Sequence, residues 1–184
     1  MDLGLAGKNV IVTGGSRGIG KQIALAFGRE GANVAICARN EGPLRDTEAE
    51  IRRENVCIYA APCDIGDAVA LDAFLDAARH ELGGVDIFVH NPSGAGMTDD
   101  PAGWAASINV DLMAAVRATW KVLPWMIESG GGCFLFISSI AGLEGGLETS
   151  LRCGKGGAHQ LCKDSLGVTG TPASPRQYNH ARLR

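Results

Sequence analysis

The sequence lacks a membrane-spanning run and a targeting leader. Residues 1–8 contain neither a basic segment nor a continuous apolar core, and no later apolar run approaches the roughly 18–20 residues that cross a bilayer. With a net charge of −3, the chain also lacks the basic excess that favours nucleic acid or an anionic membrane as a partner. These absences predict a soluble, cytoplasmic enzyme or binding domain.

Metal-binding patterns are missing as well. The six cysteines include no C-x-x-C pair, and the four histidines show no ligand spacing with cysteine or with one another. Cys37, Cys57 and Cys133 fall inside predicted strands. We therefore expect no metal and no disulfide framework, and we interpret these cysteines as small buried hydrophobic residues.

A glycine-rich segment near the start of the chain is the most informative stretch. The apolar residues 10–12 end at a cluster of glycines, and apolar side chains then recur at helical spacing over residues 19–27. This pattern predicts a buried strand, a tight turn and a helix. Without Cβ atoms, Gly14, Gly18 and Gly20 let backbone N–H groups approach a pyrophosphate at the positive end of the helix dipole. The pattern favours nucleotide binding, and a purely structural turn is the alternative.

Strand-like runs and helical patterns then alternate along the chain. Further strands are predicted over residues 33–38, 56–61, 86–89 and 133–142, and helices over residues 41–54, 67–82 and 104–128. Such alternation predicts an α/β fold, a Rossmann-like doubly wound parallel sheet in three α/β/α layers. We expect residues 1–157 to form this single domain.

An arginine follows the second predicted strand. In nucleotide-binding βαβ units, an acidic residue near this strand end binds the ribose hydroxyls of NAD, whereas an arginine accommodates the extra phosphate of NADP. Arg39 occupies this position, and Arg17 lies in the glycine-rich turn. Two cations that converge on one phosphate favour NADP(H), and a pair of solvated surface arginines is the alternative.

The motif Thr13-Gly-x-x-x-Gly-x-Gly resembles the fingerprint of the short-chain dehydrogenase/reductase family, and the likeness continues to Ser139. The resemblance implies an NAD(P)-dependent oxidoreductase, similar to 3-oxoacyl-carrier-protein reductases, that interconverts a small-molecule carbonyl and a secondary alcohol. Members of the family are homo-oligomers, and the helix over residues 104–128 looks like their interface helix, although core packing explains the same periodicity.

The resemblance also implies roles for individual residues. Ser139 matches the family's serine that bonds the substrate carbonyl. Asn109 matches the asparagine that orients a water and the catalytic lysine. Lys155 matches the catalytic lysine itself, which also binds the nicotinamide ribose. The residues implied in cofactor binding are Gly14, Ser16, Arg17, Gly18, Ile19, Gly20, Arg39, Asp64, Ile65, Asn91 and Lys155.

The catalytic tyrosine of the family is missing. Where the family has Tyr-x-x-x-Lys on one helical face, this chain has Leu151-Arg-Cys-Gly-Lys155, and neither Tyr59 nor Tyr178 follows Ser139 at a suitable spacing on a helix. Positioned acid–base catalysis contributes about 10²- to 10⁴-fold. We therefore expect a poor or dead catalyst. A nucleotide-binding protein without catalysis and a product that does not fold well are the alternatives.

Composition changes near the end of the chain. Residues 158–184 contain two prolines, few aliphatic residues and no strand-like run. We therefore expect a short helix near residues 156–166 followed by a disordered tail. The last strands that the family has are missing. If the codons from Leu151 onward are read in a frame displaced by one base, they permit the motif Tyr-x-x-x-Lys. We therefore hypothesise that a frameshift between about residues 143 and 151 truncated the family domain.

Overall fold

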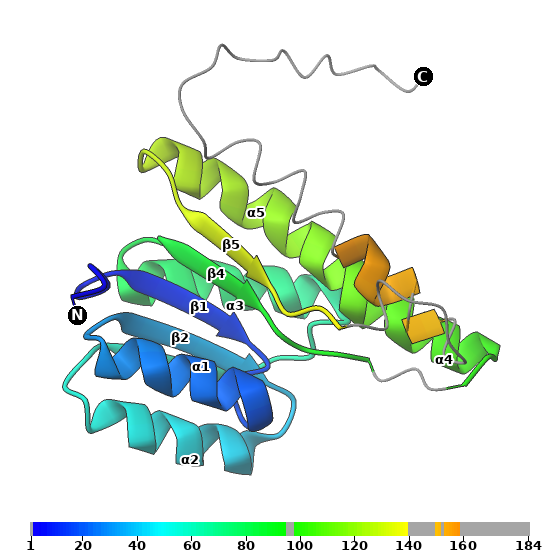
Figure 1. Cartoon of the computed structure of the whole chain (residues 1–184), viewed down its shortest axis with the longest axis horizontal. Coiled ribbons are helices and arrows are strands. Elements are labelled where there is room, and N and C mark those ends of the chain that lie inside the picture. Colours follow the sequence, from blue (N-terminus) through cyan, green and yellow to red (C-terminus); the bar gives the residue numbers. More distant parts are fainter. Residues whose placement is uncertain (1, 95–97, 140–149, 152, 159–184) are drawn as a thin grey trace.

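The carboxyl ends of five parallel strands meet at one edge of the sheet in this protein (Figure 1). The computed structural model describes residues 2–94, 98–139, 150–151 and 153–158. Within these residues the strand order is β3-β2-β1-β4-β5, and every neighbouring pair is parallel. The strands are β1 (Asn9–Thr13), β2 (Asn33–Ala38), β3 (Ile58–Pro62), β4 (Ile87–His90) and β5 (Cys133–Phe136). The predicted doubly wound parallel sheet is confirmed.

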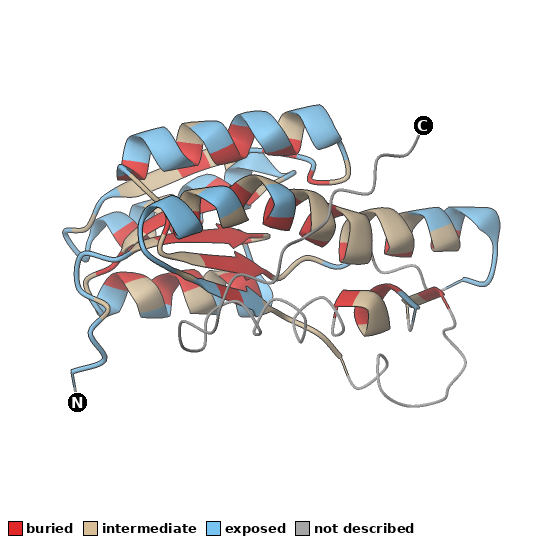
Figure 2. Cartoon of the chain, turned by 90° about the horizontal axis from the view of Figure 1, so that it is seen from above, coloured by how far each residue is buried: buried red, intermediate tan, exposed pale blue. Residues whose placement is uncertain are grey.

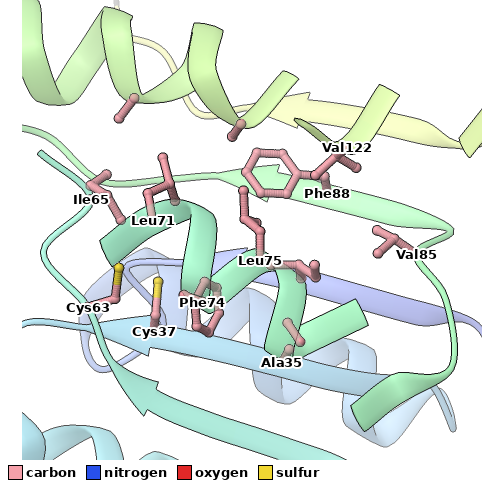
Figure 3. Packing of buried hydrophobic residues seen from close by; sticks show 14 of the residues in the cluster. Ala35, Cys37, Cys63, Ile65, Leu71, Phe74, Leu75, Val85, Phe88 and Val122 are labelled. Carbon is pink, nitrogen blue, oxygen red and sulfur yellow. The ribbon is translucent and has the colours of Figure 1, made fainter. Parts of the chain in front are cut away.

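Helices cover both faces of the sheet (Figures 1 and 2). They are α1 (Gly18–Arg29), α2 (Glu41–Arg52), α3 (Ala68–Leu82), α4 (Pro101–Ala106), the π-helix η1 (Ser107–Met113) and α5 (Ala114–Glu128). Because side chains alternate along a strand, Val10 and Val12 of β1 join the apolar cluster under α1 and α2, whereas Ile11 joins the cluster under α3 and α5 (Figure 3). Two cores therefore hold the strands from opposite sides.

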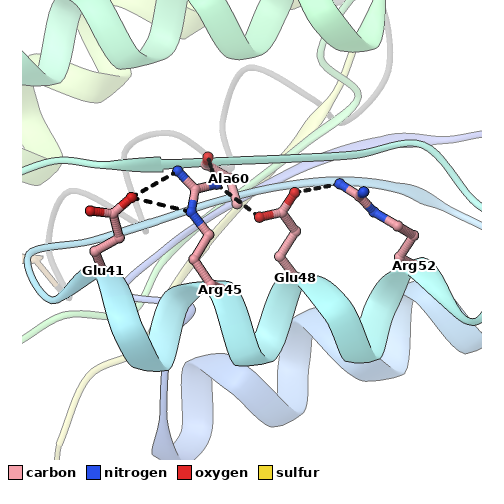
Figure 4. Close-up of polar contacts among 5 residues, drawn as sticks. All are labelled: Glu41, Arg45, Glu48, Arg52 and Ala60. Atoms are coloured by element: carbon pink, nitrogen blue, oxygen red, sulfur yellow. Dashed lines mark hydrogen bonds and ion pairs between the residues drawn. The ribbon is translucent and has the colours of Figure 1, made fainter.

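A row of ion pairs runs along α2 (Figure 4). Arg45 pairs with Glu41 and Glu48, and Arg52 pairs with Glu48. The two arginines and Glu41 are exposed to solvent, whereas the Glu48 side chain is only 14% exposed. Pairs of this spacing on one helix each contribute about 0.2–0.5 kcal/mol. Arg45 also donates a hydrogen bond of 3.1 Å to the carbonyl of Ala60. This contact fastens α2 to β3, the outer strand of the sheet.

The burial of the cysteines differs from the prediction. Cys37 and Cys63 are buried, but Cys57, Cys133 and Cys153 are exposed. Cys57 precedes the first residue of β3, and Cys133 begins β5, an outer strand among the described residues. Position in the sheet, which local sequence does not determine, therefore makes the prediction wrong for Cys57 and Cys133.

The predicted helix over residues 104–128 is longer and less regular than expected. It begins at Pro101, and the carboxylate of Asp100 caps it by accepting a hydrogen bond of 2.8 Å from the backbone N–H of Gly103. Its middle, η1, is a π-helix. Trp120 is 70% exposed on α5 although it follows the apolar periodicity, so core packing alone does not account for this residue.

The carboxyl-terminal predictions are only partly covered by the described residues. Residues 150–151 and 153–158 are helical, a few residues earlier than predicted. Residues 143–149, where the frameshift hypothesis falls, and the predicted tail from residue 159 onward lie outside the described residues. None of the helices that the structure describes combines the length and apolar character needed to cross a bilayer.

Asp67 caps α3, and we expect its removal to weaken the fold. Its carboxylate accepts hydrogen bonds from the backbone N–H groups of Val69 (2.8 Å) and Ala70 (3.1 Å), which the first turn of a helix otherwise leaves unpaired. In urea denaturation, Asp67→Ala should lower the free energy of unfolding by about 1 kcal/mol. Asp72→Ala, at an exposed position of the same helix, is the matched control and should change it by less than about 0.5 kcal/mol. Equal losses in both variants would contradict the capping role.

Candidate functional site

A pocket of about 690 Å³ opens beyond the carboxyl ends of β1, β2 and β4. This is where the strand order reverses, the usual binding edge of an open parallel sheet. The predicted site residues that line it are Gly14, Ser16, Arg17, Gly18, Ile19, Arg39, Asp64, Ile65, Asn91 and Asn109. Gly20, Ser139 and Lys155 are described by the structure but do not line the pocket.

The glycine-rich turn joins β1 to α1 along one wall of this pocket. Gly14 and Gly18 have φ angles of +71° and +56°, a left-handed conformation that a side chain disfavours. Gly20 is buried, and a Cβ atom there would collide with the carbonyl oxygen of Gly14 and the side chain of Asn91. Gly20 therefore acts by packing α1 against the turn and does not face the pocket.

Two guanidinium groups lie on the same pocket. Arg17 precedes the first residue of α1, and Arg39 follows β2. Both side chains are exposed, and neither has a hydrogen bond or an ion pair with the rest of the described chain. Their charges are thus available to an anion.

Asn91 and Asp64 hold other parts of the wall in place. Asn91 donates a hydrogen bond of 3.2 Å to the carbonyl of Gly14 and so ties the end of β4 to the glycine-rich turn. Asp64 accepts a hydrogen bond of 3.0 Å from the backbone N–H of Gly66. Asp67, three residues further on, caps α3.

Asn109 lies in η1 and faces the pocket from the opposite side. Its amide nitrogen donates to the carbonyl of Gly66 at 2.9 Å, and its amide oxygen accepts from Nη1 of Arg117 at 2.9 Å. π-Helical turns often occur at functional sites. These contacts orient the side chain at the pocket wall.

Lys155 is held away from this pocket by a buried ion pair that the sequence analysis missed. Its Nζ lies 2.9 Å from Oδ1 of Asp111, and the exposed fractions of the two side chains are 6% and 0%. Nζ also donates to the carbonyls of Pro92 (3.0 Å) and Ile137 (3.3 Å). Asn109 and Lys155, which the resemblance assigns to one relay, therefore have separate partners.

Close packing brings Lys155 to Asp111. A Cβ atom on Gly154 would lie 2.9 Å from Cβ of Asp111, so only glycine lets the helical segment of residues 150–158 approach η1 this closely. The other carboxylate oxygen of Asp111 accepts a hydrogen bond of 3.2 Å from the backbone N–H of Gly94. The hydroxyl of Ser138 donates to the carbonyl of Lys155 at 3.2 Å, which gives that serine a structural role.

His90 is a structural residue in this arrangement. Burial, reinforced by the positive charge of Lys155, lowers the pKa of His90 to about 4. The neutral ring lies 3.4 Å from the hydroxyl of Thr13 and 3.2 Å from the carbonyl of Val110. Because the His90 ring is buried and uncharged near neutral pH, it does not act as the general acid that the resemblance leads us to expect from a tyrosine.

The phenol that the family uses has no substitute among the described residues. Leu151, where the resemblance leads us to expect the tyrosine, lies on the helical segment four residues before Lys155. Tyr59 is in β3, at the sheet edge opposite β5, stacked on Phe74, and burial raises its pKa. Ser139, which follows β5, is half-buried. Tyr178 lies outside the described residues.

Several known proteins that resemble this chain are dehydrogenases and reductases of one family. The chain matches the model of the short chain dehydrogenases over residues 8–165. It is 35% identical over 143 residues to the 7α-hydroxysteroid dehydrogenase of Escherichia coli, an alignment that covers 76% of this chain and 56% of the relative. Because the family model covers most of its length, the chain belongs to the short-chain dehydrogenase/reductase family.

Two solved structures support this assignment. A 7α-hydroxysteroid dehydrogenase complexed with NADH and 7-oxo-glycochenodeoxycholic acid has a TM-score of 0.85 at 32% identity, covering 89% of this chain and 66% of that one. A metagenomic short-chain oxidoreductase in complex with NADP has a TM-score of 0.82 at 32% identity, covering 89% and 77%. Similar proteins thus bind either coenzyme. The chain spans about half the length of several curated relatives that it matches.

The Asp111–Lys155 pair should be strongly coupled. Removing one partner leaves the other charge buried and uncompensated, so Asp111→Asn and Lys155→Met should each lower the free energy of unfolding by about 3 kcal/mol. The double variant should lose clearly less than the sum of the two, because no lone charge remains. Urea denaturation of the four proteins gives the coupling energy.

The exposed pair of Lys8 and Asp86 (3.1 Å) supplies the control. Lys8→Met should cost less than about 1 kcal/mol. Additive losses at Asp111 and Lys155 would show that the two side chains do not interact in the folded protein.

Proposed function

We propose that this chain binds NADP(H) in the pocket beyond β1, β2 and β4. The observation that carries the proposal is the pair of guanidinium groups, Arg17 and Arg39, which face one pocket with no partner among the described residues. An acidic residue at the end of β2 would favour the ribose hydroxyls of NAD, but this chain has a cation there. The paired cations therefore support the phosphorylated coenzyme.

The residues present fit a dinucleotide. The pocket has the volume of small-molecule sites, roughly 300–1,000 Å³. At Gly14 a Cβ atom would lie only 3.0 Å from Asn91 Nδ2, so a side chain there would crowd this wall of the pocket. The backbone N–H groups at the start of α1, near Gly18 and Ile19, would hold the pyrophosphate. Arg17 and Arg39 would hold the additional phosphate, and Asp64 and Ile65 the adenine.

We further propose that the chemistry is that of the family, the interconversion of a carbonyl and a secondary alcohol, at a much reduced rate. The coenzyme supplies or accepts the hydride when it is bound. Ser139 would bond the substrate oxygen, but Leu151 offers no proton, and Lys155 is occupied by Asp111. We expect the substrate to be a small molecule and the protein to be cytoplasmic.

A second candidate function is NADP(H) binding without catalysis. The buried contact between Asp111 and Lys155 favours it. The lysine that the family uses at the nicotinamide ribose here contacts Asp111 and the carbonyls of Pro92 and Ile137. Homo-oligomerisation through α5, where Trp120 is exposed, remains a prediction from the resemblance.

Calorimetric titration with NADPH, NADP⁺, NADH and NAD⁺ tests the binding proposal. We expect heat of binding with the phosphorylated coenzymes and weaker binding with the other two. Folded protein that shows no heat with any of them would contradict the proposal.

Arginine variants test which groups select the coenzyme. Arg17→Ala and Arg39→Ala should each weaken NADPH binding by roughly ten- to a hundredfold, because each removes a charge-assisted contact worth about 1.5–3 kcal/mol. NADH binding should change little. Arg53→Ala, which removes an exposed arginine outside the pocket, is the matched control. Equal losses for NADPH and NADH would argue against recognition of the extra phosphate.

Leu151→Tyr tests whether the missing phenol limits turnover. With a panel of ketones, NADPH oxidation should rise by up to about 10²-fold, the lower end of what positioned acid–base catalysis contributes, because Lys155 is still held by Asp111. Leu151→Phe has nearly the same shape without the hydroxyl and should stay at the level of the parent. A similar rise in both variants would attribute the gain to packing. No rise in the tyrosine variant would favour the non-catalytic candidate.

A further inference from the structure

Two thiols meet in the wall of the pocket. Cys37 belongs to β2 and Cys63 follows β3, both are buried, and both line the pocket. Both side chains belong to the same apolar cluster, and both cysteines are free thiols. Figure 3 shows the two sulfur atoms next to each other on the α3 side of the sheet, near Leu71.

The register of β2 and β3 explains this proximity. Cys37 lies opposite Ala61 and Ala38 lies opposite Pro62, and the ladder continues through a hydrogen bond of 3.0 Å from the backbone N–H of Cys63 to the carbonyl of Ala38. Cys63 is two residues beyond Ala61, so its side chain emerges on the same face as that of Cys37. The two positions are diagonal neighbours.

Exposure divides the roles of the two thiols. Cys63 is 6% exposed and Cys37 is 0% exposed, so Cys63 is the more accessible from the pocket. The neighbouring thiol lowers the pKa of Cys63, whereas the contact with Cys63, together with burial, raises the pKa of Cys37. Because the thiolate is the reactive form of cysteine, Cys63 is the nucleophile of the pair.

We propose that Cys37 and Cys63 form a redox-active pair that a hydroperoxide converts into a disulfide, and that this disulfide weakens dinucleotide binding. The Cys63 thiolate attacks one oxygen of hydrogen peroxide, so that an S–O bond forms, the O–O bond breaks and hydroxide leaves. Cys37 sulfur then attacks the sulfenic sulfur of Cys63, the S–S bond forms, and the S–O bond breaks. The Cys37 proton goes to the departing hydroxide. Two thiols and one peroxide yield one disulfide and two waters.

The second half of the proposal rests on the proposed NADP(H) site. Diagonal positions on neighbouring strands lie about 7–8 Å apart, whereas the Cα atoms of a disulfide usually lie about 4.4–6.8 Å apart. Closing the bond must therefore move the end of β3 toward β2. This movement is feasible because β3 is an outer strand of the sheet. It displaces Asp64 and Ile65, which follow Cys63 directly and line the pocket. A bond formed under strain is also readily reduced.

Peptide mapping of the full chain tests the first half. The reduced protein is titrated with hydrogen peroxide, remaining thiols are alkylated, and the peptides are identified by mass spectrometry. We expect a peptide pair linked through Cys37 and Cys63 that disappears after treatment with dithiothreitol. Oxidation that leaves Cys37 and Cys63 unlinked while the exposed Cys57 or Cys133 reacts would overturn the proposal.

Titration with NADPH before and after oxidation tests the second half. The oxidised protein should bind at least about tenfold more weakly, and dithiothreitol should restore the affinity. Cys57→Ser, which removes an exposed thiol outside the pocket, should keep this response. In Cys37→Ala and in Cys63→Ala, peroxide should no longer weaken NADPH binding, even if the substitution itself changes the affinity for NADPH.

The outcomes separate the two proposals. A mapped disulfide with unchanged NADPH affinity overturns the coupling between oxidation and binding but leaves the binding site intact. A folded, reduced protein that binds no NADPH overturns the proposed function and the coupling, and the mapping still decides whether the disulfide forms.

Discussion

The close approach of the β1–α1 turn to the end of β4 is the constraint on which the site depends. Gly14 adopts a left-handed conformation, its carbonyl accepts a hydrogen bond from Asn91, and Gly20 packs against both with no room for a Cβ atom. Any side chain at Gly20 would push α1 off the turn. The same contacts fix the direction of α1 and the position of its first N–H groups, so one packing requirement sets the geometry of the proposed anion site.

The two halves of the site are built to different degrees. The half beyond β1 and β2 has an open pocket, glycine backbone and two cations without a partner among the described residues, whereas Lys155 on the other side is held by Asp111 in a buried ion pair. Burying two charges is costly unless they pair and bond further, and here backbone groups also bond to each partner. The segment after β4 joins the two halves, because Pro92 and Gly94 line the pocket and also bond to Lys155 and Asp111.

Much of the fold follows from local sequence, and much of the site does not. Continuous apolar runs such as residues 10–12 mark buried parallel strands, and the glycine-rich turn marks the first βα corner, so the parallel sheet and this corner of the pocket could be predicted. The contact between Asp111 and Lys155 joins residues far apart in the chain, and no periodicity reports it. The exposure of Cys133 depends on which strand is outermost. The close pairing of Cys37 and Cys63 depends on the register between β2 and β3, which only the assembled sheet defines.

The π-helical turn of η1 makes the chemistry of this wall sensitive to chain length. A π-helix holds one more residue per turn than the α-helices that flank it. Deleting a single residue within it would restore an ordinary α-helical turn, so the helices on either side would keep their orientation while the residues inside the turn would shift. Asn109 and Asp111 both lie in η1. A relative that is one residue shorter here could have residues aligned with both Asn109 and Asp111 and still place those side chains against different neighbours.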